Sequence, residues 1–566
     1  MREDKPCIVQ RDFTVLLEMG LSASDEARSQ LQVYAELVKS PVTFHTYRIT
    51  PLSLWHAASM GWTADRVLES LNAFSRWEIP ILLQEDIRNY ISRYGQLILK
   101  QGVSGEILLQ CNDPKIYSFI KERQDLERYQ LEWSSSDSSS HAGPSCAIVP
   151  LQYRGLLKQE LTRLGYPVQD LVGYHEGTSL SFQLGGEGGT LELRDYQKQA
   201  AEAFAGTGGA GGNGGNGVLV LPCGAGKTVI GMAVLEQLQC EALILTSNTT
   251  SVRQWMDELK NKTDIPSDQI GEYSGQRKQV RPVTVATYQI LTHRRSKEAA
   301  FEHMKLLSER DWGLIIYDEV HLLPAPVFRA TADIQATRRL GLTATLVRED
   351  GCERDVFSLV GPKRYDMPWK QLEAQGWIAK VECVEVRIPM TEPCAQQYIL
   401  AEGKDRYRIA AENPAKLDMV RSLLKQHAGK PAIVIGQYLD QLKTLSRELG
   451  APLISGSMAQ SERVRLFEAF RTGELNTIIV SKVANFAVDL PDAALAIEVS
   501  GSYGSRQEEA QRLGRILRPK AEDNRAYFYA LVTADSKESE FAARRQLFLI
   551  EQGYEYAIHH DNRKEA

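Results

Sequence analysis

The chain has 566 residues, of which 43% are hydrophobic and 24% charged, and its formal net charge is −6. This size predicts about three or four globular domains, and the charge excludes a polycationic nucleic-acid coat, so any nucleic-acid binding must come from local basic clusters. No stretch approaches the roughly 18 apolar residues of a membrane span, and the start lacks a signal-peptide core, so a cytoplasmic protein without membrane contact is expected.

The eight cysteines are scattered along the chain without a Cys-x-x-Cys pair. Their spacing argues against a zinc module, an iron–sulfur cluster and a disulfide framework. Reduced thiols that act as small core residues are expected.

Residues 1–95 are predicted to form a helical domain, because their apolar residues recur at helical intervals. One helix is expected in SASDEARSQLQVYAELVKS (22–40). Two more, broken at Gly61, are expected in TPLSLWHAASMGWTADRVLESLNAF (50–74).

Residues 96–188 are predicted to form a small α+β module. QLILK and GEILLQC read as paired short strands, a charged helix follows, and then come the strand AIVPL and the helix YRGLLKQELTRLG. The serine-rich stretch at 134–145 cannot bury a core and is expected to be a loop.

From residue 189 onward, short β-branched runs alternate with helical segments. The runs do not alternate with polar residues, which is typical of strands buried on both faces of parallel sheets with crossover helices. They fall into two sets, so two α/β domains are expected, over residues 189–366 and 367–566. The runs are GVLVLP, EALILTS, VTVATY, GLIIYDE and RLGLTAT in the first domain, and AIVIG, PLISG, NTIIVS and AALAIEV in the second.

Two glycine-rich segments are candidates for a phosphate-binding loop. The long run GTGGAGGNGGNG (206–217) precedes the strand GVLVL and so lies on the wrong side of it to line a phosphate. We expect this run to be a surface loop that joins the preceding helix to the strand. A short cluster, PCGAGKT, follows the same strand and opens a helix, which is where a P-loop belongs.

In this short cluster, Gly224 and Gly226 let backbone N–H groups approach phosphates at the helix N-terminus. Lys227 supplies a point charge for the β- and γ-phosphates, and Thr228 places a hydroxyl where Mg²⁺ binds. The full pattern G-x-x-x-x-G-K-[ST] requires a glycine where this chain has Leu221.

A hydrophobic strand that ends in adjacent carboxylates supports an ATP site. In GLIIYDEVH (313–321), Asp318 is placed to hold the Mg²⁺ bound by Thr228, and Glu319 is placed to orient the attacking water. The competing interpretation is an acidic loop after a core strand.

The helix QEEAQRLGRILRPK (507–520) carries Arg512, Arg515 and Arg518 at three-residue spacing, which gathers guanidinium groups on one side. A basic helix is often only a solvated face. If the helix faces the P-loop across a cleft, one or two of these arginines can contact the γ-phosphate as negative charge grows in the transition state. The bound nucleotide would then open and close the cleft.

With these three elements in place, residues 190–540 resemble superfamily 2 helicases of the XPB type, in their bacterial or archaeal form. The resemblance implies two tandem RecA-like parallel-sheet domains and an ATP-dependent 3′→5′ DNA helicase or translocase of nucleotide excision repair. It implies ATP and Mg²⁺ as cofactors, and as partners single-stranded DNA, the fork or duplex junction, and a nuclease or repair protein.

The resemblance also assigns residues to ATP and to coupling. LRDYQKQA (193–200) is similar to the adenine-sensing element, LPCGAGKT to motif I, YDEVH to motif II and LGLTAT to motif III. The implied ATP-binding residues are Arg194, Gln197, Pro222, Cys223, Gly224, Ala225, Gly226, Lys227 and Thr228. The implied coupling residues are His321, Thr343, Ala344, Thr345 and Asp489.

The triplet after motif III resembles the RED element that this family uses in strand separation, and its alternative is a solvated charged loop. VTVATYQIL (283–291) resembles motif Ic, which grips the DNA backbone, and SKVANFAVDLP (481–491) resembles motif V. The implied DNA-binding and strand-separating residues are Thr287, Tyr288, Arg348, Glu349, Asp350 and Ser481.

In the second domain, QRLGRILRP resembles motif VI, which implies Arg515 and Arg518 as arginine fingers with Gln511 beside them. Motif V departs from the family wording, because Ala484–Asn485 stands where a Gly–Asp pair is usual. Residues 390–416 are expected to form either a thumb-like insertion or a plain connecting helix pair.

The first 188 residues resemble the helical N-terminal domain and the damage-recognition-type module of XPB-like proteins, and the missing four-cysteine spacing excludes the XPD type. Two other functions remain open. One is an RNA-stimulated ATPase, which the DEVH wording and the charged triplet disfavour. The other is an ATP-gated DNA-binding scaffold with little unwinding.

Overall fold

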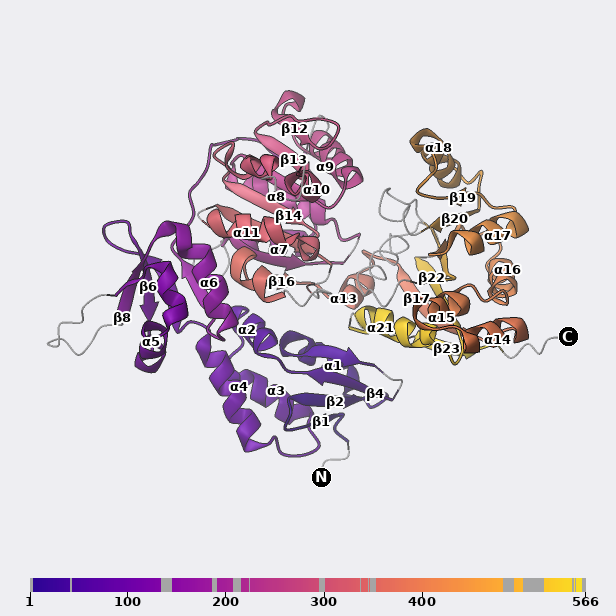
Figure 1. Ribbon diagram of the computed structural model, residues 1–566, viewed down its shortest axis with the longest axis horizontal. Helices are drawn as coiled ribbons and strands as arrows, with labels where there is room; N and C mark the ends of the chain where they lie inside the picture. Colours follow the sequence, from indigo (N-terminus) through magenta and orange to yellow (C-terminus); the bar gives the residue numbers. More distant parts are fainter. Residues whose placement is uncertain are drawn as a thin grey trace. The chain divides into compact units, whose positions relative to one another are not determined.

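The computed structural model (Figure 1) describes residues 4–40, 43–133, 145–185, 191–206, 215–222, 224–294, 301–335, 337–344, 346, 353–481, 493–501, 524–551, 554 and 556–561. They group into two compact units, Met1–Leu221 with Gly226–Asp366, and Pro222–Ala225 with Met367–Ala566. The first unit therefore holds the N-terminal region (residues 1–188) and the first α/β domain, and the second unit holds the second α/β domain.

The first unit begins with a four-stranded antiparallel sheet in the order β1-β2-β4-β3. Helices α1, α2 and α3 lie in the segments where helices were predicted, whereas α4 was not predicted and the sheet was left out. The strands are β1 (Cys7–Val9), β2 (Thr14–Glu18), β3 (Glu36–Lys39) and β4 (Phe44–Arg48), and the helices are α1 (Ser24–Tyr34), α2 (Pro51–Ser59), α3 (Ala64–Phe74) and α4 (Ile81–Arg93).

The sheet was missed because its strands are only three to five residues long. Within so short a run, apolar residues of period two coincide with helical spacing. In β2, Val15 and Leu17 are buried while their neighbours are partly exposed. The predicted first helix ends at Tyr34, and β3 pairs with β4 instead of continuing it.

The break between α2 and α3 is confirmed. Gly61 has a φ of +84°, which a residue without a Cβ adopts at little cost. Each helix begins with a threonine cap, because Thr50 Oγ1 accepts a hydrogen bond from Ser53 N at 3.0 Å and Thr63 Oγ1 accepts one from Arg66 N at 3.2 Å.

The α+β module is a five-stranded sheet in the order β7-β8-β6-β5-β9. Its strand pairs are antiparallel except for β5 with β9, which run parallel. The predicted charged helix ends at Lys121, and a separate 3₁₀ helix follows at Gln124–Tyr129. The elements are β5 (Leu97–Gln101), β6 (Ile107–Cys111), α5 (Pro114–Lys121), β7 (Glu132–Trp133), β8 (Ser145–Val149), α6 (Arg154–Arg163) and β9 (Val168–Leu171).

The first α/β domain is a seven-stranded parallel sheet in the order β12-β13-β11-β14-β15-β10-β16. The five predicted strands are present, and β12 and β16 are additional. The strands are β10 (Asn216–Val220), β11 (Ala242–Thr246), β12 (Ile270–Tyr273), β13 (Val283–Thr287), β14 (Leu314–Asp318), β15 (Arg338–Thr343) and β16 (Lys363–Asp366). The helices are α7 (Asp195–Ala205), α8 (Lys227–Leu238), α9 (Thr249–Lys262), α10 (Tyr288–Leu291), α11 (Ala325–Asp333), α12 (Glu353–Asp355) and the π-helical η7 (Val356–Val360).

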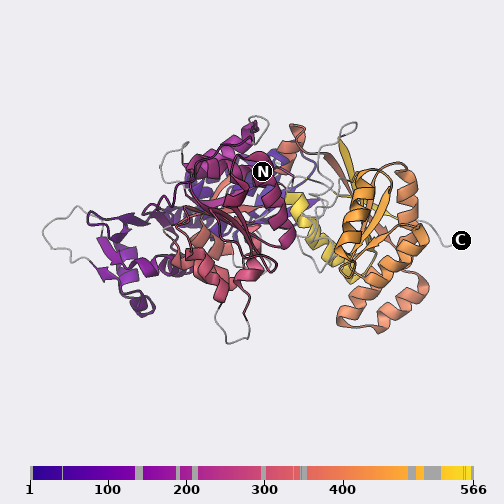
Figure 2. The same cartoon turned by 90° about the horizontal axis from the view of Figure 1, so that it is seen from above.

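The second α/β domain is also a seven-stranded parallel sheet, in the order β19-β20-β18-β21-β22-β17-β23. Figure 2 shows helices on both sides of its strands, as expected for strands buried on two faces. The strands are β17 (Lys380–Ile388), β18 (Ala432–Gly436), β19 (Leu453–Ile454), β20 (Thr477–Ser481), β21 (Leu495–Glu498), β22 (Arg525–Thr533) and β23 (Tyr556–His560), and the helices are α13 (Trp369–Ala374), α14 (Glu392–Leu400), α15 (Gly403–Ala411), α16 (Lys416–Gln426), α17 (Leu439–Leu449), α18 (Gln460–Arg471) and α21 (Lys537–Glu551). Two parallel RecA-like sheets confirm the predicted fold class.

Residues 390–416 contain the helix pair α14 and α15, followed by α16. Tyr407 of α15 is buried and donates from its hydroxyl to Gly501 O at 2.7 Å. Ile399 and Leu400, at the end of α14, are 71% and 86% exposed. The segment is therefore a helix pair whose second helix, α15, packs against the rest of the domain. Its role as a thumb stays a prediction.

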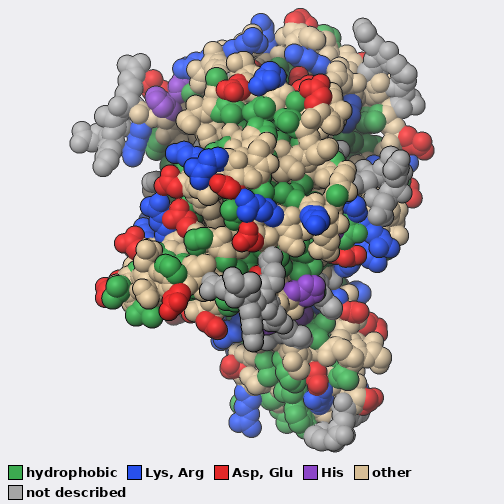
Figure 3. Space-filling model, turned by 90° about the vertical axis from the view of Figure 1, so that its right-hand side faces the viewer, with side chains coloured by type: hydrophobic (Ala, Val, Ile, Leu, Met, Phe, Trp, Pro, Cys, Tyr) green, Lys and Arg blue, Asp and Glu red, His purple; other side chains and the backbone are tan. Residues whose placement is uncertain are grey.

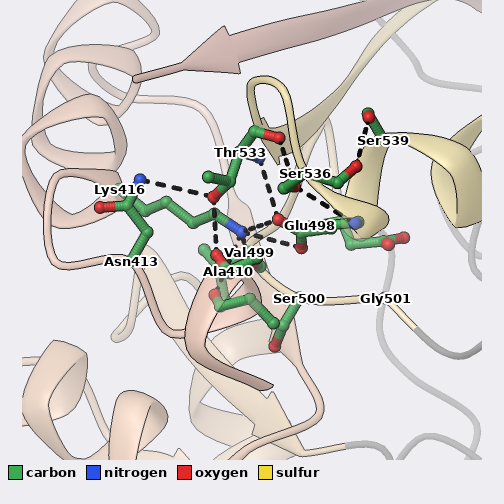
Figure 4. A network of polar contacts seen from close by, with 12 residues as sticks. Ala410, Asn413, Lys416, Glu498, Val499, Ser500, Gly501, Thr533, Ser536 and Ser539 are labelled. Atoms are coloured by element: carbon green, nitrogen blue, oxygen red, sulfur yellow. Dashed lines mark hydrogen bonds and ion pairs between the residues drawn. The ribbon is translucent and has the colours of Figure 1, made fainter. Parts of the chain in front are cut away.

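A buried polar network joins the carboxyl ends of β21 and β22 to the start of α21 (Figure 4). Lys416 Nζ lies 2.9 and 2.8 Å from the two carboxylate oxygens of Glu538 and donates to Val499 O at 2.8 Å. Thr533 N donates to Glu538 Oε2 at 2.9 Å. Both charges are buried but partnered, so the network holds the end of this sheet in one arrangement.

The long glycine run needs a corrected boundary. Gly206 ends α7 with a φ of +82°, and residues 207–214 lie outside the described part of the chain. Asn216 and Gly217 belong to β10, where Arg364 Nε donates to Asn216 O at 3.0 Å. The predicted serine-rich loop lies almost wholly outside the described residues.

Among the described cysteines, Cys7, Cys111, Cys146, Cys240, Cys383 and Cys394 are free thiols. Within the described ranges, no helix combines the length and apolar character that crossing a membrane requires. Basic and acidic side chains are interspersed on the face that Figure 3 presents, in keeping with a net charge of −6.

Candidate ATP site of the first α/β domain

The phosphate loop leaves β10 and enters α8, which begins at Lys227. Gly224 and Gly226 have φ values of +84° and +76°, a backbone region that residues with a Cβ rarely adopt. Leu221, which replaces the glycine of the full pattern, is completely buried, and its N–H donates to Thr343 O at 2.9 Å. The departure from the pattern therefore falls in the core, next to β15.

The first turn of α7 lies against this loop. A Cβ on Gly226 would come within 2.7 Å of Gln197 Nε2, so the glycine allows the amide to approach. Gln197 is 6% exposed, and its Oε1 accepts a hydrogen bond from Arg194 N at 3.0 Å. Arg194 Nη1 donates to Tyr196 Oη at 3.2 Å. The structure thus brings Gln197, predicted to contact adenine, beside the predicted phosphate loop.

The two carboxylates of motif II follow β14, whose residues Leu314–Tyr317 are buried. Lys227 Nζ lies 3.2 Å from Glu319 Oε1, with the two side chains only 12% and 18% exposed. Glu319 has a φ of +51° and a ψ of 56°, which is unusual for a residue other than glycine. The backbone is therefore held in an uncommon conformation at the residue expected to orient water.

Burial, reinforced by the Glu319 carboxylate, raises the pKa of Asp318. Burial alone would also raise the pKa of Glu319, but the charges of Lys227 and then His321 outweigh it and lower that pKa. The two neighbouring carboxylates therefore differ in acidity, and Glu319 is the more acidic of the two.

Motifs II and III are joined by a buried hydrogen bond. His321 Nδ1 lies 2.7 Å from Thr343 Oγ1, and the two residues are 4% and 0% exposed. The same ring nitrogen is 3.5 Å from Glu319 Oε2. A predicted coupling pair therefore touches the predicted catalytic carboxylate.

One residue at the site was missed by sequence reasoning. Trp255 of α9 donates from its indole Nε1 to Asp318 Oδ2 at 2.9 Å. The only sequence signal was a single tryptophan in a polar helix, which is more typical of core packing than of a site. Nothing in local spacing connects it to Asp318.

The chain matches three family models. "ERCC3/RAD25/XPB C-terminal helicase" covers residues 372–565, "Type III restriction enzyme, res subunit" covers residues 190–348, and "Helicase conserved C-terminal domain" covers residues 7–134. It is 49% identical over 555 residues to the "DNA 3'-5' helicase XPB" of Kineococcus radiotolerans, covering 98% of this chain and 96% of that protein. It is 50% identical over 555 residues to the protein of the same name in Mycobacterium tuberculosis, covering 98% of each.

The chain belongs to the XPB helicase family. Similarity extends to eukaryotes, because the "General transcription and DNA repair factor IIH helicase/translocase subunit XPB" of Antonospora locustae is 32% identical over 566 residues, covering 97% of this chain and 81% of that protein. The likeness spans all four predicted domains and so includes the N-terminal half.

In this XPB-family chain, the predicted DNA contacts of motif Ic are mostly buried. Thr287 is 3% exposed and caps α10 by accepting from Ile290 N at 3.2 Å. Tyr288 is 2% exposed and donates from its hydroxyl to Asp318 O at 2.8 Å. Any DNA contact here falls to their backbone or to the exposed Gln289, and it stays a prediction. Ser481 is likewise 3% exposed, at the end of β20.

Several predicted site residues of the XPB-family motifs lie outside the described part of the chain, so the structure places none of them. They are Cys223 of motif I, Thr345 of motif III, the triplet Arg348, Glu349 and Asp350, Asp489 of motif V, and Gln511, Arg515 and Arg518 of motif VI.

Proposed function

We propose that this chain is an ATP-dependent DNA helicase or translocase that moves 3′→5′ and works in DNA repair of the nucleotide-excision type. The contact of Lys227 with Glu319, beside Asp318 at the end of a buried strand, carries the ATPase part of this proposal. The names of its relatives support DNA as the substrate, the polarity, and repair as the process.

In this proposal, Lys227 neutralises negative charge on the β- and γ-phosphates of ATP, and the glycine loop presents backbone N–H groups to them. Glu319, held ionised by Lys227 and His321, orients the attacking water and accepts its proton at a carboxylate oxygen. Gln197 and Arg194 contact the adenine. Burial of these groups strengthens each electrostatic interaction at the site.

The residues fit a magnesium ion. Asp318 supplies a carboxylate and Thr228, in the first turn of α8, supplies a hydroxyl; both are the hard oxygen donors that Mg²⁺ prefers. When bound there, Mg²⁺ would supply positive charge that offsets the phosphate oxygens.

Coupling of hydrolysis to movement is assigned to His321, Thr343 and Ala344, with Thr345 and Asp489 carried over from the motifs. A change of charge at Glu319 reaches Thr343 through the His321 ring, and Thr343 ends the strand β15. Ala344, the next residue, is 4% exposed, so movement of this turn must displace packed atoms.

The remaining roles come from motif matches alone. Arg515 and Arg518 are proposed to contact the γ-phosphate, with Gln511 beside them. Arg348, Glu349 and Asp350 are proposed to separate strands, and Ser481 with the motif Ic segment to follow one strand of the DNA. A nuclease or repair protein is the proposed partner, and the cytoplasm the proposed site of action.

The deciding experiment is strand displacement on forked duplexes with a 3′ or a 5′ single-stranded tail, with and without ATP. We expect displacement only with ATP and only from the 3′-tailed fork. Efficient displacement from the 5′ tail would contradict the polarity.

Two alternatives are tested by ATPase assays with single-stranded DNA and with RNA. Stimulation by RNA alone would favour an RNA-stimulated ATPase. Tight, ATP-dependent DNA binding without appreciable turnover would favour a scaffold. The contact of Lys227 with Glu319 disfavours the scaffold, because binding alone does not require a group that activates water.

A further inference from the structure

Trp255 is a core residue whose indole N–H contacts a side chain of the candidate site. It lies on α9, is 1% exposed, and donates from Nε1 to Asp318 Oδ2 at 2.9 Å. Buried tryptophans usually direct this N–H to some acceptor. Here the acceptor is an ionisable carboxylate of the site, so the bond is charge-assisted and fixes the orientation of that carboxylate.

Two other buried tryptophans of the first unit provide a comparison. Trp55 Nε1 donates to Tyr90 O at 3.1 Å, and Trp312 Nε1 donates to Leu306 O at 2.8 Å. Both acceptors are backbone carbonyls, as expected when the bond only satisfies a core indole. Trp255 differs from them because its N–H donates to a side chain, Asp318, that the sequence predicts to be functional.

The same indole also fixes the position of α8, the helix that begins with Lys227 and Thr228. A Cβ on Gly231 of α8 would lie 2.7 Å from Trp255 Cη2, closer than real Cβ contacts come. Gly231 thus allows the ring to pack directly against the helix backbone. One side chain contacts the P-loop helix with its ring and the motif II carboxylate with its N–H.

We propose that Trp255 is a positioning residue for magnesium-dependent ATP binding. Its N–H holds the Asp318 carboxylate while its ring sets α8, so the two oxygen donors, Asp318 and Thr228, are preset relative to each other. The inference rests on the proposed ATPase site and deepens it. When the two donors are preset, part of the entropy cost of ordering them around a metal is already met. Removing Trp255 should therefore weaken Mg²⁺-dependent ATP binding more than ATP binding without Mg²⁺.

Two variants of Trp255 separate the ring from the N–H, and a third variant is the control. Trp255→Phe keeps an aromatic ring and removes the donor. Trp255→His keeps a ring N–H at a similar reach and removes much of the packing. Trp312→Phe is the matched control, since it removes a buried indole N–H of the same unit whose acceptor is a backbone carbonyl.

The readouts are binding of a fluorescent ATP analogue in EDTA, the same binding titrated with Mg²⁺ at pH 8, and thermal unfolding without nucleotide. For Trp255→Phe we expect the half-saturating Mg²⁺ concentration to rise about tenfold, with binding in EDTA close to that of the wild type. Trp255→His should be less stable yet keep near-normal Mg²⁺ dependence. Trp312→Phe should leave Mg²⁺ dependence unchanged.

The inference is overturned if Trp255→Phe leaves the Mg²⁺ titration unchanged, or if it weakens binding equally with and without Mg²⁺. It is also overturned if Trp255→Phe fails to fold and Trp255→His, which retains the donor, shows the raised Mg²⁺ requirement. Failure of the proposed function is distinguishable, because a wild-type chain that binds ATP with Mg²⁺ but shows no DNA-stimulated hydrolysis would refute the motor and leave this result standing.

Discussion

Glu319 combines a strained backbone with a partnered side chain. Its φ of +51° belongs to the left-handed region, which costs a residue with a Cβ on the order of 1 kcal/mol. The contacts with Lys227 and His321 offset that cost and keep the carboxylate beside the P-loop. Backbone strain of this kind clusters at functional sites, which agrees with the proposed catalytic role.

Lys227→Ala should lower ATP turnover at least about 100-fold, because it removes the cation that both neutralises the phosphates and keeps Glu319 ionised. DNA binding measured by fluorescence anisotropy should change little, since the lysine faces Glu319 rather than a DNA contact. Lys227→Arg, which keeps the charge but not the geometry, serves as control. Turnover that survives Lys227→Ala would mean that the site is misassigned.

Thr343→Val removes the hydroxyl that bonds His321 and preserves the shape of the side chain. We expect ATPase activity without DNA to stay within about twofold and strand displacement per ATP to fall about tenfold, since the change interrupts coupling and spares phosphate contacts. Thr331→Val is the matched control, because its hydroxyl is also buried in this domain but contacts Tyr317. Equal loss in both variants would indicate a general packing effect.

At the scale of elements, η7 packs against the N-terminal helices and so joins residues 1–95 to the first α/β domain. The ring of Phe357 is surrounded by those of Trp55, His56 and Tyr94, with centroids 6.3, 5.1 and 6.4 Å away. Lys363 N donates to His56 Nδ1 at 3.3 Å, which requires that nitrogen to carry no proton. Burial, with the Lys363 cation adding to it, lowers the pKa of His56 to about 3.

This contact should make stability depend on pH. As the pH falls below about 6.5, the unfolded chain protonates His56 while the folded chain does not until about 3, so stability is full above that range and is lost within it. His56→Asn, which keeps an acceptor but cannot take up the proton, should reduce the loss between pH 7.5 and 4.5 by about 2 kcal/mol in urea unfolding. His45, whose pKa burial lowers to about 4, titrates in both proteins and cancels in the comparison. Parallel pH profiles would contradict this account.

At the scale of the molecule, the N-terminal region (residues 1–188) and the first α/β domain share buried contacts. Within the α+β module, Asp170 pairs with Arg154 at 2.7 Å and with Lys158 at 2.8 Å. The guanidinium groups of Arg154 and of Arg339, which lies on β15, both stack on Tyr174. Burial lowers the pKa of Lys158 to about 7, despite the favourable charge of Asp170. These parts therefore pack as one compact unit, Met1–Leu221 with Gly226–Asp366.

A chain that begins at residue 190 should consequently be less stable than the first unit within the whole protein. It exposes Phe357 and leaves Arg339 without Tyr174, so we expect its melting temperature to fall by at least about 5 °C and its binding of a hydrophobic dye to rise. Calorimetry of both proteins measures this. Phe357→Ser in the truncated chain, expected to reduce the dye signal, is the control. An unchanged melting temperature would mean that the N-terminal region contributes little to the stability of the α/β domain.

Much of the α/β architecture and the chemistry of its short motifs could be predicted from the sequence. Buried parallel strands are continuous apolar runs, and a P-loop or an acidic strand end needs only adjacent residues, so both patterns are local. β12 and β16 are edge strands of four residues and were missed, as was the N-terminal sheet, because runs so short carry no clear period. In the second domain, β17, β22 and β23 were also missed, although β17 and β22 have nine residues each.

The sequence by itself determined which residues we propose to bind phosphate and activate water, since Lys227, Asp318 and Glu319 lie in contiguous motifs. Only the tertiary structure decided that Trp255 holds Asp318, that His321 meets Thr343, and that Thr287 and Tyr288 turn inward. The physical reason is that these contacts join separate strands and helices. Their geometry depends on sheet order and on close packing such as that at Gly231, and no spacing along one chain segment encodes either.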